Sequence, residues 1–490
     1  MPTTTPEQTL ALVRLAAELS TKARGTRRRF MRRLVENIRD ALRTTGAEFH
    51  VESQWNRIFV QTTASPDRLD VLARVPGISS YSVVLGRCSA TLDEIVRTGV
   101  EHFGEQVKGR TYAVRARRAG THPFSSSDVM YALGAALNPG ATVDLTNPDV
   151  EVEVEVRDED VYFFSGKHQA LGGLPLAVEG RAVCLLSGGF DSAVAAWMML
   201  KRGVQLDYVF CNLAGEAYER SVAQVGWVLA ENWSYGTRPK LHVVDFADVL
   251  DDLRATTQPR YWQLVLKRLM YRAAERVGRE LRAHGIVTGE AIGQVSSQTL
   301  ANLGAIDRAS EIPVFRPLIG FDKMDIVELS KRIGTFELSA NVQEYCAIAP
   351  GRPVTSATRR ETEQEDAKLD PSVLARAIEA RRTLDLRDLR ESDLAVAYLF
   401  TDELPADAVV VDLREEDEWE EWHYPGSVNR PSWQLTSDPR ALGRDGKFVL
   451  YCERGVQAAQ VAEAMQRAGV EAYAFKGGIA AMKRLAERKA

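Results

Sequence analysis

The sequence predicts an α/β protein of several domains. Its 490 residues exceed what one hydrophobic core organises, and strand-like apolar runs alternate with helix-like segments along the whole chain. Apolar residues make up 45% and charged residues 26%, as in an ordinary globular protein. No apolar run reaches the roughly 18 residues of a membrane span, and the N-terminus lacks a signal pattern. We therefore expect a cytoplasmic protein without membrane contact.

Residues 1–75 are expected to form a first small α/β domain. Phe30, Leu34, Ile38 and Leu42 fall on one stripe of a basic helix, and Gly46 follows as a stop. One strand is expected over residues 51–62 and a second helix over residues 68–76.

Residues 76–173 predict a second α/β unit. A helix over residues 91–107 precedes an arginine-bearing strand over 110–120, and serines with Asp128 can cap a helix that follows. Val and Glu alternate from residue 150, which predicts a half-buried strand with the acids outside.

From residue 174 to 395 the pattern changes to continuous apolar strands between helices. It predicts a parallel sheet covered on both faces, followed by a charged helical connector over residues 356–390. Residues 396–490 predict a small terminal α/β domain with strands near 408–415, 448–452 and 471–478.

Charge is distributed unevenly along the chain. Residues 14–40 carry nine Lys or Arg against three Asp or Glu, whereas residues 401–440 carry three against eleven. A polyanion partner for the basic end and two ordinary solvated faces are both consistent with this pattern.

The five cysteines do not form a disulfide framework or a zinc site. They are few and odd in number, and no CxxC pair or Cys/His cluster occurs, so no metal centre is expected. Cys88, Cys184 and Cys211 lie on or beside predicted strands and are expected in cores. Any cysteine chemistry is then expected to be reactive chemistry in a reducing compartment.

The segment "SGGFDS" follows a buried strand and opens a helix. Glycines let backbone N–H groups turn toward a ligand, and the helix N-terminus favours an anion. The segment resembles the PP-loop of ATP pyrophosphatases, which bind ATP with Mg²⁺ and release AMP and pyrophosphate. The resemblance assigns ATP binding to Ser187, Gly188, Gly189, Asp191 and Ser192, with Asp191 also catalytic.

The segment "FVLYCERGVQ" places Cys452 between a strand and a helix. A helix N-terminus and a neighbouring arginine favour the thiolate, the nucleophilic form of cysteine. Ala458 stands where a cysteine phosphatase needs arginine, which excludes that class. The upstream "DLREEDEWEEWHYPGSVN" resembles the entry of rhodaneses, which carry sulfur as a cysteine persulfide. The loop expected to hold it is Cys452, Glu453, Arg454, Gly455, Val456 and Gln457.

The two motifs together point to replacement of oxygen by sulfur. With "GEAIGQVSSQT" and "YAVRARRAGTHPFSSSDV", nearly the whole chain resembles the tRNA 4-thiouridine synthetases. The resemblance implies a ferredoxin-like domain, a THUMP domain, a Rossmann-like PP-loop domain and a rhodanese-like domain. It adds to the ATP-binding set Leu185, Leu186, Lys267, Gly289 and Gln298.

The resemblance also implies a mechanism and partners. A cysteine desulfurase loads Cys452 with sulfur, the uracil oxygen at tRNA position 8 is adenylated, and sulfur replaces it. Cys346 acts as second catalytic cysteine and forms a redox disulfide with Cys452. The residues expected to contact tRNA are Lys22, Arg24, Arg27, Arg28, Arg29, Arg115, Arg117 and Arg118.

Several alternatives stay open at this stage. The chain could make a different tRNA thionucleoside, act as an amide-forming ligase with a passive rhodanese fold, or relay sulfur on RNA without catalysis. Sulfur donation to a thiamine carrier protein is a possible second role.

Overall fold

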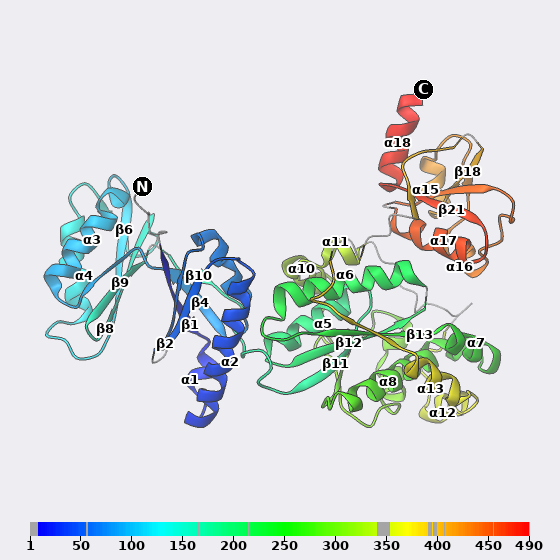
Figure 1. The fold of residues 1–490 in the computed structure, drawn as a ribbon, viewed down its shortest axis with the longest axis horizontal. Coiled ribbons are helices and arrows are strands. Elements are labelled where there is room, and N and C mark those ends of the chain that lie inside the picture. Colours follow the sequence, from blue (N-terminus) through cyan, green and yellow to red (C-terminus); the bar gives the residue numbers. More distant parts are fainter. Residues whose placement is uncertain are drawn as a thin grey trace. The chain divides into compact units, whose positions relative to one another are not determined.

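The computed structural model describes residues 8–54, 57–164, 166–213, 215–340, 353–390, 394, 399–405, 407–453 and 455–489. The chain divides into two compact units. The first is residues 1–178 with 201–203 and 235–237, and the second holds the remainder. Figure 1 shows the elements of each unit, which are described separately below.

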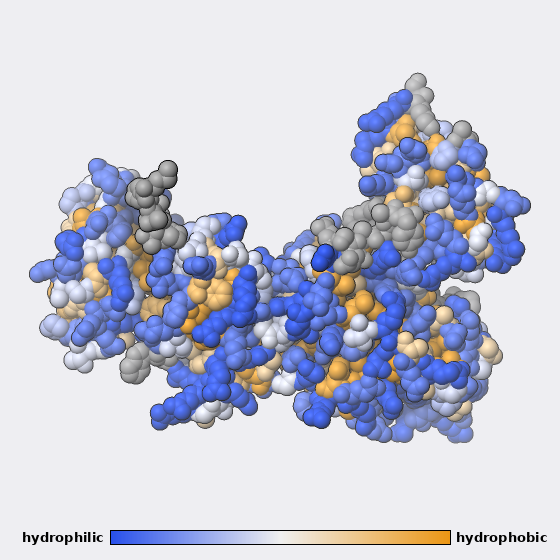
Figure 2. Space-filling model, in the orientation of Figure 1, coloured by the Kyte–Doolittle hydropathy of each residue, from blue (hydrophilic) through white to orange (hydrophobic). Residues whose placement is uncertain are grey.

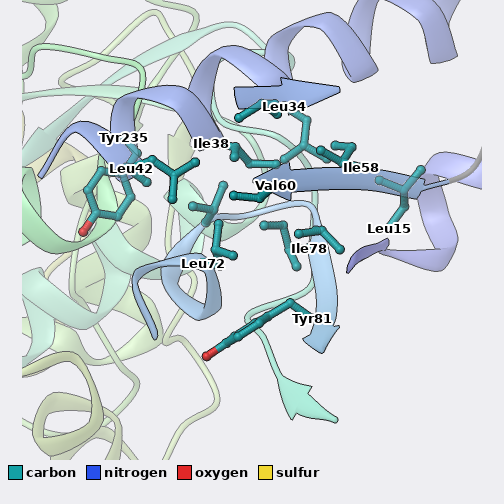
Figure 3. Close-up of a cluster of buried hydrophobic side chains, with 14 of the residues drawn as sticks. Leu15, Leu34, Ile38, Leu42, Ile58, Val60, Leu72, Ile78, Tyr81 and Tyr235 are labelled. Carbon is teal, nitrogen blue, oxygen red and sulfur yellow. The ribbon is translucent and has the colours of Figure 1, made fainter. Parts of the chain in front are cut away.

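The first unit begins with a five-stranded antiparallel sheet in the order β10-β4-β1-β3-β2. Helix α2 (Arg24–Arg43) buries its apolar stripe on this sheet, and Figure 3 shows Leu34, Ile38 and Leu42 beside Ile58 and Val60. This confirms the expected stripe of the basic helix. The strands are β1 (Thr9–Leu15), β2 (Phe49–Gln54), β3 (Arg57–Thr62), β4 (Ile78–Val83) and β10 (His168–Gln169).

One local prediction in this region was wrong. The expected single strand over residues 51–62 is a pair of antiparallel strands, β2 and β3, because each pairs with the other residue by residue. The expected helix over 68–76 is present as the 3-10 helix η1 (Pro66–Arg74). β4 and β10 belong to this first sheet although they lie beyond residue 75.

A second sheet in the same unit has the order β5-β9-β8-β6-β7, and helices α3 (Leu92–Val107) and α4 (Ser126–Leu137) pack on it. A capping box between Ser125 and Asp128 opens α4, as the sequence predicts. The strands are β5 (Gly86–Ser89), β6 (Thr111–Ala119), β7 (Thr142–Val143), β8 (Val150–Arg157) and β9 (Asp160–Phe164).

The prediction that all acids of β8 lie outside was wrong for Glu155. This side chain is buried and lies 3.0 Å from Arg57 and 3.5 Å from Arg14 of the first sheet. Burial opposes ionisation of Glu155, but the arginines around it, with Arg157, hold its pKa below the ordinary value. The alternating pattern could not show this, because the arginines come from distant strands.

The second unit contains the predicted parallel sheet, in the order β15-β14-β11-β12-β13-β16. Its five first strands run parallel, and β16 (Arg382–Asp385) is antiparallel to β13. The charged connector is therefore not wholly helical, since β16 follows its helices α12 (Arg359–Asp366) and α13 (Pro371–Glu379). The parallel strands are β11 (Arg181–Leu185), β12 (Gln205–Asn212), β13 (Lys240–Asp245), β14 (Ile286–Val287) and β15 (Val314–Phe315).

Helices follow these strands in the manner of a Rossmann-like fold. A large buried cluster joins the sheet to α7 and α8, and includes Val183, Val209 and Leu266. The helices are α5 (Phe190–Lys201), α6 (Glu216–Trp233), α7 (Ala247–Thr256), α8 (Trp262–Glu280), α9 (Leu300–Asp307), α10 (Lys323–Ile333) and α11 (Phe336–Ser339).

The C-terminal region forms a separate five-stranded parallel sheet in the order β17-β21-β20-β18-β19. The strands are β17 (Phe400–Thr401), β18 (Ala408–Asp412), β19 (Val428–Asn429), β20 (Lys447–Tyr451) and β21 (Glu471–Phe475). The helices are α15 (Glu416–Glu421), α16 (Ser432–Ser437), α17 (Val456–Arg467) and α18 (Gly478–Lys489).

Hydrophilic residues cover much of the visible surface, with apolar residues scattered among them (Figure 2). Among the described residues, no helix combines the length and the apolar character that a membrane crossing requires.

Candidate functional site

A cavity of about 1160 Å³, counting its open mouth, lies where β11, β12 and β14 end. The carboxyl ends of parallel strands are where open α/β sheets bind ligands. Nine of the ten residues expected to bind ATP line this cavity, and Gly188 is the exception. They are Leu185, Leu186, Ser187, Gly189, Asp191, Ser192, Lys267, Gly289 and Gln298.

The PP-loop is held in shape by its two serines. The Ser187 N–H donates to the Ser192 hydroxyl oxygen over 3.1 Å, and the Gly189 N–H donates to the Ser187 hydroxyl oxygen over 3.3 Å. The loop leads directly into α5, which begins at Phe190. The loop is thus pre-ordered at a helix N-terminus, the arrangement that favours an anion such as pyrophosphate.

Gly289 is required by a close approach of two chain segments. A Cβ on Gly289 would lie 2.5 Å from the backbone carbon of Asp191 and from the nitrogen of Ser192. The segment after β14 therefore packs directly on the PP-loop. Only glycine leaves room for that contact.

A buried ionic network forms one wall of the cavity around Glu290. Its carboxylate lies 3.1 Å from Lys267 Nζ and 2.9 Å from Arg316 Nε, and it accepts hydrogen bonds from Thr288 and Tyr271. Burial opposes ionisation, but the two cations outweigh it and hold the pKa of Glu290 at about 2. Glu290 is therefore ionised at neutral pH and fixes Lys267 at the cavity wall.

Lys323 is a functional candidate that sequence reasoning missed. Its Nζ lies 3.2 Å from Oδ1 of Asp191 and 5.3 Å from the centre of the Phe190 ring. It comes from α10, which begins 132 positions after the PP-loop aspartate. Its position beside the PP-loop carboxylate places a second cation next to the PP-loop.

The segment from Ala291 to Gln298 closes another side of the cavity. Gln298 is buried, and its side-chain oxygen Oε1 accepts from the Ala291 N–H. Its main-chain carbonyl oxygen accepts from the Gly293 N–H. The cavity lining also includes Phe210 and Tyr218, whose rings meet edge to face. Apolar walls of this kind suit a flat base, with a few polar groups to orient it.

The second candidate site is the loop that holds Cys452. The thiol sulfur accepts from the Gly455 N–H over 3.2 Å, and Gly455 has a left-handed backbone with φ of 92°. The Ile479 N–H at the start of α18 donates to the Cys452 carbonyl over 3.0 Å. Cys452 is buried, with 2% of its surface exposed, so the loop surrounds the sulfur with protein.

The rhodanese-like entry motif begins at the end of β18, which pairs with β20, the strand that precedes Cys452. Arg414 forms two hydrogen bonds to Asp412, of 3.0 and 2.6 Å, and both side chains are buried. Asn429 donates to the Arg414 carbonyl over 2.9 Å, which ties the motif's last residue to its first turn. Burial, with a contribution from Asp412, raises the pKa of the neighbouring Tyr451 to about 12. The tyrosine hydroxyl therefore stays protonated at neutral pH.

Other expected residues fall at separate places. Five of the expected tRNA contacts lie at or near the start of α2, where Lys22 and Arg29 each lie over the ring of Phe30. Three lie on β6, where Arg115 pairs with Glu151, and Arg117 and Arg118 are exposed. Both groups belong to the first unit. Cys346 and Arg454 lie outside the described residues, so the expected disulfide and the arginine beside Cys452 stay predictions.

The core cysteines behave as expected in part. Cys184 is fully buried, and burial raises its thiol pKa. Cys211 is buried as well but lines the cavity, and Cys88 is only half-buried. Within the described ranges, no group of three or more His, Cys, Asp or Glu side chains is placed to hold a metal ion.

Four protein-family models match this chain, one after another along the sequence. The ThiI ferredoxin-like domain matches residues 10–82 and the THUMP domain 89–165. The thiamine biosynthesis protein (ThiI) model matches 177–370 and the rhodanese-like domain 397–485. A PP-loop cavity and a rhodanese-type cysteine loop on one chain define a multidomain sulfurtransferase of the PP-loop class.

Curated relatives span the whole architecture. A tRNA sulfurtransferase of Marinobacter nauticus is 37% identical over 91% of this chain and 94% of its own length. One of Desulfurococcus amylolyticus is 36% identical over 96% and 97%. The chain belongs to the tRNA sulfurtransferase family. A solved 4-thiouridine synthetase in complex with RNA and ATP matches with a TM-score of 0.68 and 32% identity, covering 77% of this chain and 99% of that chain.

Proposed function

We propose that this protein is a tRNA sulfurtransferase that replaces the uracil O4 of a tRNA uridine by sulfur with the use of ATP. The observation that carries the proposal is the presence of a PP-loop cavity and a rhodanese-type cysteine loop in one chain. Full-length relatives named tRNA sulfurtransferase support it. By resemblance the target is the uridine at position 8.

The first step takes place in the cavity. The PP-loop and the N-terminus of α5 bind the pyrophosphate end of ATP, and Lys267 and Lys323 bring positive charge to the phosphates. Magnesium would enter with the nucleotide, and Asp191 offers it carboxylate oxygens. Uracil O4 attacks the α-phosphorus, the bond to pyrophosphate breaks, and the N3 proton is lost. Oxygen has then become part of AMP, a good leaving group.

The second step delivers sulfur. A persulfide on Cys452 supplies its outer sulfur to uracil C4, and AMP leaves with the former O4. The Gly455 N–H, which already donates to the sulfur, would stabilise negative charge there. A cysteine desulfurase is the expected source of this sulfur.

Release of the product requires a second thiol. If C4 remains joined to Cys452 through the transferred sulfur, Cys346 attacks the Cys452 sulfur and frees the thiouridine. Two thiols are oxidised to a disulfide as the transferred sulfur is reduced, and a dithiol reductant restores them.

The basic residues of α2 and β6 would hold the tRNA phosphates. The same persulfide could serve a thiamine sulfur carrier, a second role suggested by the description of the matching ThiI family.

The test is thiolation of an unmodified tRNA transcript with ATP, magnesium, cysteine and a cysteine desulfurase. The nucleosides are then identified by mass. The proposal predicts 4-thiouridine that requires ATP, Asp191 and Cys452. A stable persulfide on Cys452 without any thiouridine would make the protein a sulfur carrier. A different thionucleoside would correct the substrate position.

A further inference from the structure

One polar group in the cavity has no partner within the protein. Of the buried side-chain nitrogen and oxygen atoms that line it, within the described residues, only Nε2 of Gln294 lacks a hydrogen bond. Three other polar side chains of the lining have partners: Lys267 pairs with Glu290, Asp191 with Lys323, and Oε1 of Gln298 accepts from the Ala291 N–H. A buried donor left unpaired costs about 1–3 kcal/mol, so a partner is expected in the loaded site.

Gln294 is fixed in place by the segment that carries it. The neighbouring Gly293 N–H donates to the Gln298 carbonyl, and the Gln298 N–H donates to the Val295 carbonyl over 2.9 Å. The Ile292 N–H donates to the Ile319 carbonyl, which ties the segment to the loop after β15. Because both ends are held, the backbone that carries Gln294 is fixed at the cavity wall.

The residues beside Gln294 suit the flat face of a base. Ile292 and Val295 are 49% and 42% exposed, and Val295 lines the cavity. Single-stranded RNA bases are recognised by packing on such surfaces and by hydrogen bonds to their edges. The PP-loop, Lys267 and Lys323 already provide groups that bind the phosphates of ATP.

We infer that Gln294 is a specificity-determining residue that donates from Nε2 to the O2 oxygen of the target uracil. This assignment rests on the proposed function, which requires a uracil in the same cavity as ATP. O4 must stay free to attack phosphorus and then departs in AMP. O2 remains a carbonyl acceptor in the substrate, the adenylate and the product, so one donor serves it throughout.

The experiment combines a change in the protein with a change of one atom in the RNA. Single-turnover pyrophosphate release is measured on tRNA that carries uridine or 2-thiouridine at the target position, because sulfur at C2 is a weaker acceptor. Full-length wild type, Gln294→Met and Gln294→Glu are compared. Gln106→Met, at an exposed position of α3, is the matched control. ATP affinity of each variant is measured without tRNA.

The expected result is a roughly tenfold slower release for Gln294→Met on uridine, and a larger loss for Gln294→Glu, which presents an acceptor to O2. The 2-thio substitution should slow the wild type but have no further effect on Gln294→Met. ATP affinity and the control should be unchanged.

Three results would overturn the assignment. If Gln294→Met and the 2-thio substitution each slow the rate independently, so that their effects multiply, Gln294 does not bind O2. A matching loss of ATP affinity would assign the amide to the nucleotide, or indicate a misfolded cavity. An unchanged rate of pyrophosphate release by Gln294→Met on uridine tRNA would show that Gln294 does not contribute to this step. Failure of the wild type to release pyrophosphate on uridine tRNA is distinct, since it would refute the proposed function itself.

Discussion

Replacing Glu290 with glutamine removes one charge from the network at the cavity wall while keeping the side chain's size. The carboxyl pKa is held at about 2, against an ordinary value of 4.5, by Lys267 and Arg316. A shift of that size corresponds to about 3 kcal/mol in favour of the folded, ionised state. We expect Glu290→Gln to lower the local stability around α8 and β14 by about that amount at pH 7.

The direction of the pKa shift determines how the stabilisation by Glu290 changes with pH. Because the folded pKa is lowered, the contribution of Glu290 is complete above the unfolded pKa near 4.5. It is lost as pH falls toward 2. The local free energy of unfolding should differ between wild type and Glu290→Gln by a constant amount above pH 5.5. At pH 4 this difference should be smaller by about 1 kcal/mol.

Amide hydrogen exchange of peptides from α8, followed by mass spectrometry between pH 4 and 7, measures this difference locally. Glu311→Gln is the matched control, since Glu311 is 84% exposed in its pair with Arg279 and should matter by less than about 1 kcal/mol. Equal effects of the two variants, or a Glu290 difference that does not change with pH, would refute the reasoning.

Three further changes have defined outcomes. Gly289→Ala should displace the PP-loop and weaken ATP binding at least tenfold, measured by titration, whereas Gly304→Ala, with open space at its Cβ, should not. Gly455→Ala should reduce the amount of persulfide on the thiol of the cysteine loop, measured by intact mass. Gly443→Ala should reduce it less, because Gly443 has the same backbone strain but open space around an added Cβ. Lys323→Gln removes the cation beside the PP-loop aspartate, and we expect roughly tenfold slower tRNA-dependent pyrophosphate release with ATP saturating. Equal effects of a glycine variant and its control, or an unchanged rate of pyrophosphate release for Lys323→Gln, would contradict these assignments.

The position of a candidate loop could be predicted from the sequence where its residues are contiguous. The PP-loop is six consecutive residues between a strand and a helix, and its serines pair with each other within that stretch. The cysteine loop is similar, since Gly455 lies three positions from the sulfur it contacts. Local spacing therefore encodes the backbone geometry of both loops.

Groups that act through distant partners could not be predicted. Lys323 reaches Asp191 across 132 positions, and Glu290 joins cations from two different segments. Glu155 looks like an outward-facing acid in its strand until arginines from another sheet surround it. Such pairs depend on the tertiary arrangement, which periodicity and motif spacing do not carry.

The central claim is that the oxygen lost from uracil leaves as part of AMP. The direct test uses a tRNA transcript whose target uridine carries ¹⁸O at C4, incubated with the wild-type protein, ATP, magnesium and a persulfide donor. The mass of the released AMP is then measured. The account predicts one ¹⁸O in AMP for each thiouridine formed, and no labelled AMP with Asp191→Ala. Unlabelled AMP formed together with thiouridine would contradict it.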